Sequence, residues 1–343
     1  MKRSLFDYSY PPELVAQRPL QERADSRMLV LNRQQHMMEH SYFRNIVQQL
    51  RPGDLLVAND TKVIAARLLG KNEKGAPIEI LLLRPATEEN HWYCLGRPGK
   101  KLKTGLKIDF GESFSGTVLK KNERGIKIQF HSKHFSKDLE KWGLPPLPPY
   151  IRRKSKEDYT EEDRVRYQTV FAREKGSTAA PTAGLHFSEE ILAELRSKEI
   201  DMAYVTLHVS GDTFLPVQTE NLKEHRMHGE AFLISDKACM QINQAKKEKR
   251  RVLAVGTTTV RTLESGTVDG TITKQKGITH LFIYPEYTFQ IVDGILTNFH
   301  QPESTLLAMV SAFAGRELIL KAYKEAIDKK YRLFSYGDCM LIL

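Results

Sequence analysis

The stretch SEEILAELRSKEIDMAYVTLHV, residues 188–209, shows the fold class of this chain most clearly. Ser188 stands before two acidic residues, which is typical of a helix start because oxygen atoms and negative charge stabilise the free N–H groups there. Ile191, Leu192 and Leu195 then form one apolar stripe along the expected helix. Residues 202–209 are expected to form a strand, so the stretch predicts the helix-and-strand unit of α/β proteins.

The same alternation continues on both sides of this stretch. A helix is expected over 42–50 and a buried strand over 53–58. Further strands are expected at 252–255 and 280–284, and further helices are expected from 235 or 236 to about 251, from the 256–259 turn to 264, over 303–315 and over 316–329. This order predicts a mainly parallel α/β sheet or barrel.

Residues 68–149 follow a different pattern of short strand-like runs separated by turn residues. The runs are 78–83, 91–95, 107–110, 116–119 and 126–130. Such a series predicts a small antiparallel barrel or sandwich, and the four prolines of WGLPPLPPYIRR (142–153) enforce an extended connector after it. We therefore expect an inserted β domain at 68–149 within a main domain formed by 1–67 and 150–343.

The positive charge is concentrated in one segment. Residues 97–156 contain 16 Lys or Arg and 5 Asp or Glu, although the whole chain has a net charge of +10. A nearly neutral body with one strongly basic segment is typical of a protein that binds a polyanion, and nucleic acid is the favoured partner. A solvated lysine-rich surface remains the plain alternative. Lipid headgroups fit less well, because no amphipathic basic helix accompanies the charge.

Composition and missing motifs exclude several classes. Cys94, Cys239 and Cys339 lie far apart without a CxxC pair, so we expect neither a zinc framework nor disulfides, and a cytoplasmic protein. No signal peptide is evident, and the longest purely aliphatic run, 80–83, is far too short to span a membrane. The phosphate-loop, dinucleotide and hydrolase-elbow glycine patterns are absent.

The segment STAAPTAGLHF (177–187) is expected to form a pocket wall. Its small side chains let a ligand approach the backbone, and Pro181, Leu185 and Phe187 make a flexible linker the weaker alternative. Polar motifs also follow predicted strands at 59–61, 256–259 and 298–300, and another spans the end of the predicted strand 202–209, with residues 206–208 in the strand and 210–213 after it. Capping or turn formation explains each one singly, but four of them at strand ends predict a pocket. The helix start at 256–259 could bind an anion such as a carboxylate.

A metal site is conceivable but not expected. His225 and His228 form an HxxH pair that His208 or Glu230 could complete. The HExxH pattern is absent, no cysteine lies nearby, and an HxxH often occurs by chance.

Taken together, ten motifs in order give the chain a resemblance to one family. The motifs span 6–30, 53–70, 145–153, 163–172, 177–187, 205–209, 224–230, 255–264, 297–315 and 331–342. On these motifs the chain resembles, almost end to end, the S-adenosylmethionine:tRNA ribosyltransferase-isomerases of queuosine biosynthesis. The resemblance implies an α/β-barrel main domain with an inserted small antiparallel β-barrel domain. It also implies that the ribosyl group of S-adenosylmethionine is transferred and isomerised onto 7-aminomethyl-7-deazaguanine at the tRNA wobble position, releasing adenine and methionine.

This chemistry suggests roles for particular residues. The sulfonium acidifies protons on the ribose 5′ carbon, and a neutral histidine, His186 or His208, could remove one. Departing adenine needs a proton, for which His300 is a candidate. Asp60, Glu230, Phe187 and Phe299 are candidates to stabilise the sulfonium, and Arg261, Thr257 and Thr258 to hold the methionine carboxylate. Thr178, Thr182 and Gly184 complete the expected S-adenosylmethionine site, and no metal or redox cofactor is required.

The resemblance also implies a monomer that binds tRNA with a G-type wobble base and does not enter a membrane. Phosphate contacts are expected from Lys100, Lys101, Arg152, Arg153 and Lys154, and Tyr150 could provide a platform for a flipped base.

Four positions depart from the family pattern: Asp212 and Glu286 replace glycines, Gln301 replaces leucine and Cys339 replaces alanine. The change at 212 leaves open an RNA-binding relative with altered catalysis. His225 and His228 leave open a second alternative, a metal-dependent RNA hydrolase.

Overall fold

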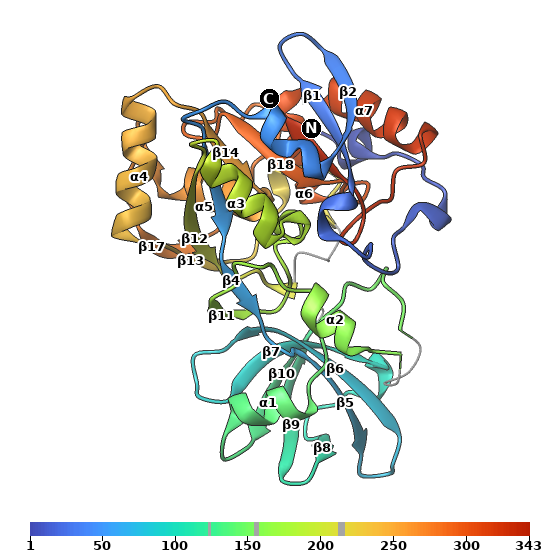
Figure 1. The fold of residues 1–343 in the computed structure, drawn as a ribbon. Helices are drawn as coiled ribbons and strands as arrows, with labels where there is room; N and C mark the ends of the chain where they lie inside the picture. Colours follow the sequence, from blue (N-terminus) through green and yellow to red (C-terminus); the bar gives the residue numbers. More distant parts are fainter. Residues whose placement is uncertain (123–124, 154–157, 212–216) are drawn as a thin grey trace.

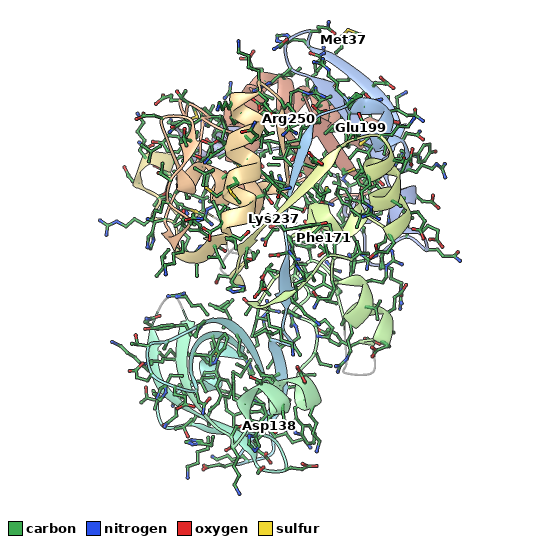
Figure 2. The ribbon with its side chains drawn as sticks, turned by 60° about the vertical axis from the view of Figure 1, so that its left-hand side comes forward. Met37, Asp138, Phe171, Glu199, Lys237 and Arg250 are labelled. Carbon is green, nitrogen blue, oxygen red and sulfur yellow. The ribbon has the colours of Figure 1, made fainter. Side chains whose placement is uncertain are left out.

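The computed structural model describes residues 1–122, 125–153, 158–211 and 217–343. The chain forms an α/β part, in which both termini lie, and a β barrel beyond it (Figure 1). In Figure 2, Met37 marks the end of the α/β part far from the barrel, and Asp138 marks the barrel side. The predicted α/β class with an inserted antiparallel barrel is confirmed, but in the described residues the main part is a sheet with two edge strands rather than the expected α/β barrel.

The α/β part is built on a nine-stranded sheet with the order β17-β13-β12-β3-β14-β18-β19-β1-β2. The strands are β1 (Arg27–Asn32), β2 (Met37–Tyr42), β3 (Leu55–Asn59), β12 (Asp201–Leu207), β13 (Glu230–Ile234), β14 (Val252–Val255), β17 (Lys276–Thr279), β18 (Gly294–Asn298) and β19 (Cys339–Ile342). Among the described residues, four of its ladders are parallel and four antiparallel, so the sheet is mixed rather than mainly parallel. Three of the parallel ladders lie together around β3 and β14, and the fourth joins β19 to β1.

Helices pack on this sheet and bury apolar side chains on both of its faces. They are α3 (Glu189–Ser197), α4 (Asp236–Lys247), α5 (Thr257–Gly266), α6 (Thr305–Ala314) and α7 (Arg316–Asp328). The predicted start of α3 is confirmed, because the Ser188 hydroxyl accepts a hydrogen bond from the N–H of Ile191. β3 is buried along its whole length, as expected for a strand in the middle of a covered sheet.

Two predicted elements were wrong. The helix expected over 42–50 is the end of β2 followed by a 3-10 helix, Phe43–Gln49. The strand expected at 280–284 is absent from the described structure, because β17 ends its pairing with β13 at Thr279, opposite Glu230. Within this segment Ile283 is buried, and the partly buried rings of Phe282 and Tyr284 contact each other.

The barrel closes in the order β10-β7-β6-β5-β8-β9, with every ladder antiparallel. Its strands are β5 (Arg67–Asn72), β6 (Pro77–Pro85), β7 (His91–Arg97), β8 (Lys107–Gly111), β9 (Phe114–Asn122) and β10 (Gly125–His131). Alternate side chains point inward and form a separate apolar core, which α1 (Phe135–Trp142) helps to cover. The division at residues 68 and 149 stays a prediction.

Smaller elements complete the fold. They are β4 (Thr61–Val63) paired with β11 (Glu174–Ser177), α2 (Glu161–Arg166), the hairpin of β15 (Thr267–Val268) and β16 (Thr271–Ile272), and 3-10 helices at Arg3–Phe6, Pro12–Leu14, Arg23–Asp25, Gly99–Lys101, Thr182–His186 and Leu222–Glu224. No helix in the described ranges is both long enough and apolar enough to cross a bilayer.

Candidate active site

A cavity opens at the carboxyl ends of β14 and β18, two neighbouring parallel strands. The start of α5 and the segment 297–301 form one side of it, and the small-residue segment 179–183 forms another. Tyr150 and Ser335 also line it. The sequence motifs at 177–187, 256–259 and 298–300 therefore converge on one cavity, whereas the motif at 59–61, which was expected to join them, does not line it.

The start of α5 is suited to binding an anion. Gly256 precedes it with φ of 88°, a left-handed conformation that favours glycine. No side chain caps this helix, and the N–H groups of Thr257 and Thr258 have no hydrogen-bond partner among the described residues. Free N–H groups and the helix dipole together attract negative charge, so a carboxylate fits here.

His300 is the histidine that lines this cavity in the described part of the chain. Its Nε2 lies 2.8 Å from the hydroxyl of Thr297, and burial lowers the pKa of the imidazole to about 3. The ring is therefore neutral at neutral pH. It can accept a proton, but it cannot serve as the proton donor that we expected for departing adenine unless its charge state changes first.

His186 lies behind the cavity wall, with 4% of its surface exposed. Its Nδ1 is 2.8 Å from the hydroxyl of Ser26, and its Nε2 is 3.2 Å from the amide nitrogen of Asn298. Burial lowers the pKa of His186 to about 4. Both ring nitrogens are thus engaged within the protein, which favours a positioning role over that of a general base.

His208 and Asp60 form a separate cluster. His208 Nδ1 lies 2.9 Å from the hydroxyl of Thr61, and burial lowers the pKa of this half-buried ring. The Asp60 carboxylate accepts hydrogen bonds from Arg173 and Thr206, each at 2.7 Å. The structure does not bring either residue into the cavity at β14 and β18.

The cluster instead adjoins a second cavity. A Cβ added at Gly176 would lie 2.9 Å from the His208 ring, and Gly176 lines this cavity together with Lys62 and Trp92. The second cavity contains none of the predicted small-residue or helix-start motifs. For this reason we place the candidate active site at β14 and β18.

Arg261 and Glu230 bind each other rather than facing a ligand. Their side chains form a buried ion pair, and the Glu230 carboxylate also accepts a hydrogen bond of 2.8 Å from the N–H of Ser210. Burial opposes ionisation of Glu230, but His228 and Arg261 outweigh it and lower its pKa. Arg261 is therefore already paired with Glu230, and it does not line the cavity at β14 and β18.

The two histidines of the HxxH pair, His225 and His228, have different partners. His228 lies 3.2 Å from Glu230, whereas the His225 ring packs against Phe282 with 5.1 Å between the ring centres. In the described ranges, no group of three His, Cys, Asp or Glu residues is placed to hold a metal ion. The alternative of a metal-dependent hydrolase therefore gains no support.

The other predicted S-adenosylmethionine contacts divide between cavity and core. Thr182 and Phe299 line the cavity. Phe187 is fully buried against Phe43, and Gly184 packs closely against Phe171, so both residues are structural.

Thr178 connects the two parts of the molecule. Its hydroxyl donates to the carbonyl of Leu83 in β6 and accepts from the N–H of Gly211, both at 2.9 Å.

The predicted tRNA contacts differ in availability. Lys100, Lys101 and Arg152 are exposed. Arg153 is not, because it forms a buried ion pair with Asp163 at 2.7 Å.

Tyr150 lines the cavity with its hydroxyl 2.7 Å from Ser335, and burial raises the pKa of that hydroxyl. Lys154 lies outside the described residues, as does Asp212.

Sequence reasoning missed Asn298 as a site residue, although it noted the motif that contains it. Its side chain lies at the end of β18, is 2% exposed and lines the cavity. The signal was its place directly after a buried strand, where parallel strands bring residues together. Of the departures from the family pattern, Gln301 lines the cavity, Cys339 is buried in β19, and Glu286 adopts a φ of 91°, which glycine would favour.

Comparisons with known proteins agree with the motifs. A family model described as "Queuosine biosynthesis protein" matches residues 3–342. The chain is 49% identical to proteins named S-adenosylmethionine:tRNA ribosyltransferase-isomerase from Sulfurihydrogenibium sp. and from Halothermothrix orenii, over 100% of each chain. It is also similar to the crystal structure of S-adenosylmethionine tRNA ribosyltransferase from Thermotoga maritima, with 37% identity, a TM-score of 0.56, and coverage of 99% of this chain and 100% of that one.

Proposed function

Because the chain belongs to the queuosine biosynthesis protein family, we propose that it is an S-adenosylmethionine:tRNA ribosyltransferase-isomerase. The observation that carries this proposal is the 49% identity to relatives of that name over 100% of both chains. The enzyme would transfer and isomerise the ribosyl group of S-adenosylmethionine onto 7-aminomethyl-7-deazaguanine at the wobble position of tRNA. Adenine and methionine would leave.

The geometry of the cavity supports roles for its residues. The free N–H groups at the start of α5 bind the methionine carboxylate, in place of the occupied Arg261. His300 acts as the general base, because it is the histidine that lines the cavity in the described part of the chain. When His300 Nε2–H donates to the hydroxyl of Thr297, Nδ1 carries the lone pair that takes a proton from the ribose 5′ carbon.

The nucleic acid docks on exposed cations outside the cavity. Lys100 and Lys101 lie together in a 3-10 helix of the barrel segment, and Arg152 follows the connector that returns to the α/β part. Exposed cations attract phosphates over a long range, so phosphate binding does not require these side chains to lie in a cavity. The modified base then enters the cavity beside Tyr150.

Release of free adenine tests the proposal. The protein is incubated with S-adenosylmethionine and tRNA carrying 7-aminomethyl-7-deazaguanine, with and without a chelator. We expect adenine release that requires the modified tRNA and is unchanged by the chelator. Binding of both substrates without adenine release would instead support the RNA-binding alternative, and loss of activity on chelation would contradict a metal-free reaction.

A further inference from the structure

The side-chain oxygen of Asn298 has no hydrogen-bond partner among the described residues, although the residue is 2% exposed. Its amide nitrogen lies 3.1 Å from the carbonyl of Phe334, 3.2 Å from Nε2 of His186 and 3.4 Å from the carbonyl of Asp338. A carbonyl can only accept, so the NH₂ group must face this side. The orientation of the amide is thereby fixed, and Oδ1 is left as an unused acceptor on a residue of the cavity wall.

His186 holds the amide in this orientation. Since Nε2 accepts from Asn298, the ring proton resides on Nδ1 and is donated to the hydroxyl of Ser26. The Ser26 hydroxyl can in turn donate to the carbonyl of Arg23, 3.3 Å away. Every donor in this series of hydrogen bonds has an acceptor, and the series ends at the free oxygen of Asn298.

Asn298 and the start of α5 line the same cavity. β14 and β18 are paired, with Val255 opposite Leu296, so their next residues stand side by side at the same edge of the sheet. The uncapped start of α5 supplies N–H donors there, and Asn298 supplies an acceptor. A carboxylate and an ammonium group on one carbon match this pair of donors and acceptor.

We propose that Asn298 Oδ1 accepts a hydrogen bond from the α-ammonium group of S-adenosylmethionine, while the start of α5 binds its carboxylate. Asn298 is then a binding residue, and His186 is a positioning residue that acts through it. The inference rests on the proposed function, which makes S-adenosylmethionine the ligand.

Calorimetric titration without tRNA tests the inference apart from catalysis. The ligands are S-adenosylmethionine, its analogue without the amino group, and an analogue in which purine replaces adenine. We expect Asn298→Ala to weaken binding of S-adenosylmethionine about 10- to 100-fold, the range for a hydrogen bond to a charged group. The same change should alter binding of the deaminated analogue less than about twofold.

Ser311→Ala is the matched control. Like Asn298→Ala, it removes a buried side-chain oxygen that has no partner in the described structure. Ser311, however, lies in α6 and does not line the cavity. It should leave all three affinities unchanged.

Each other outcome overturns the inference. An equal loss for S-adenosylmethionine and the deaminated analogue would mean general damage, and a loss that disappears only with the purine analogue would assign Oδ1 to the adenine amino group. The unaltered protein offers a check that does not depend on the folding of a variant: it must bind S-adenosylmethionine more tightly than the deaminated analogue. Because binding is measured without turnover, a failure of adenine release would leave this result standing, and the two proposals remain distinguishable.

Discussion

At the scale of the residue, His300 offers the most direct test of the chemistry. His300→Gln keeps a group that can bond to Thr297 but removes the nitrogen that accepts a proton. General-base catalysis contributes about 10²- to 10⁴-fold, so adenine release in a single turnover should fall by about this factor. Binding of S-adenosylmethionine should change little. His36→Gln, on an exposed turn, serves as the control, and an unaffected rate in His300→Gln would refute the assignment.

The buried histidines also predict how stability depends on pH. The pKa is lowered from 6.5 to about 4 for His186 and to about 3 for His300, so the unfolded chain binds more protons at mildly acidic pH. Stability is therefore complete above about pH 6.5 and is lost as the pH falls toward 4, by about 1.4 kcal/mol per pH unit for each histidine. Urea unfolding between pH 4.5 and 7 should show a shallower decline for His300→Gln than for the unaltered protein. Parallel declines would contradict the buried neutral state.

At the scale of the element, α3 depends on its cap. The hydroxyl of Ser188 accepts from the N–H of Ile191, so Ser188→Ala should lower the free energy of unfolding by about 1 kcal/mol. Ser188→Asp should retain most of it. Ser197→Ala, at the exposed other end of the helix, should cost less than about 0.5 kcal/mol. Equal effects in urea unfolding at both ends would show that the cap contributes nothing specific.

The success of sequence-based prediction also differs between elements. α3 and the barrel strands follow local rules of caps, period and turns, and these elements are present. Residues 280–284 have the apolar content of a strand, but strand formation needs a neighbour, and β13 pairs only as far as Thr279.

The predicted roles of site residues also depended on partners that are distant in the sequence, in this case through ion pairs. Arg261 and Asp60 were expected to face a ligand. Their partners, Glu230 and Arg173, lie far away in the sequence, so no local pattern could reveal that both are occupied. The start of α5 and His300 do line one cavity, because the carboxyl ends of neighbouring parallel strands meet at one edge.

At the scale of the whole molecule, tRNA binding should depend on the barrel and on salt. Lys100→Ala with Lys101→Ala should weaken tRNA binding and reduce the slope of log affinity against log salt by about 1.5, while binding of S-adenosylmethionine stays unchanged. The charge-matched control is Lys321→Ala with Lys329→Ala, at exposed positions on and directly after α7. Filter binding at several salt concentrations would measure both pairs. Equal slopes for the two double variants would show that Lys100 and Lys101 of the barrel do not contact the tRNA phosphates.

The bridge made by Thr178 has a mechanical consequence. One hydroxyl joins the backbone of barrel strand β6 to Gly211, and its own residue directly precedes the wall segment of the cavity. The barrel therefore cannot tilt freely against the α/β part without straining this joint. If tRNA docks on the barrel as proposed, a movement of the barrel would strain these hydrogen bonds and so displace the wall of the cavity.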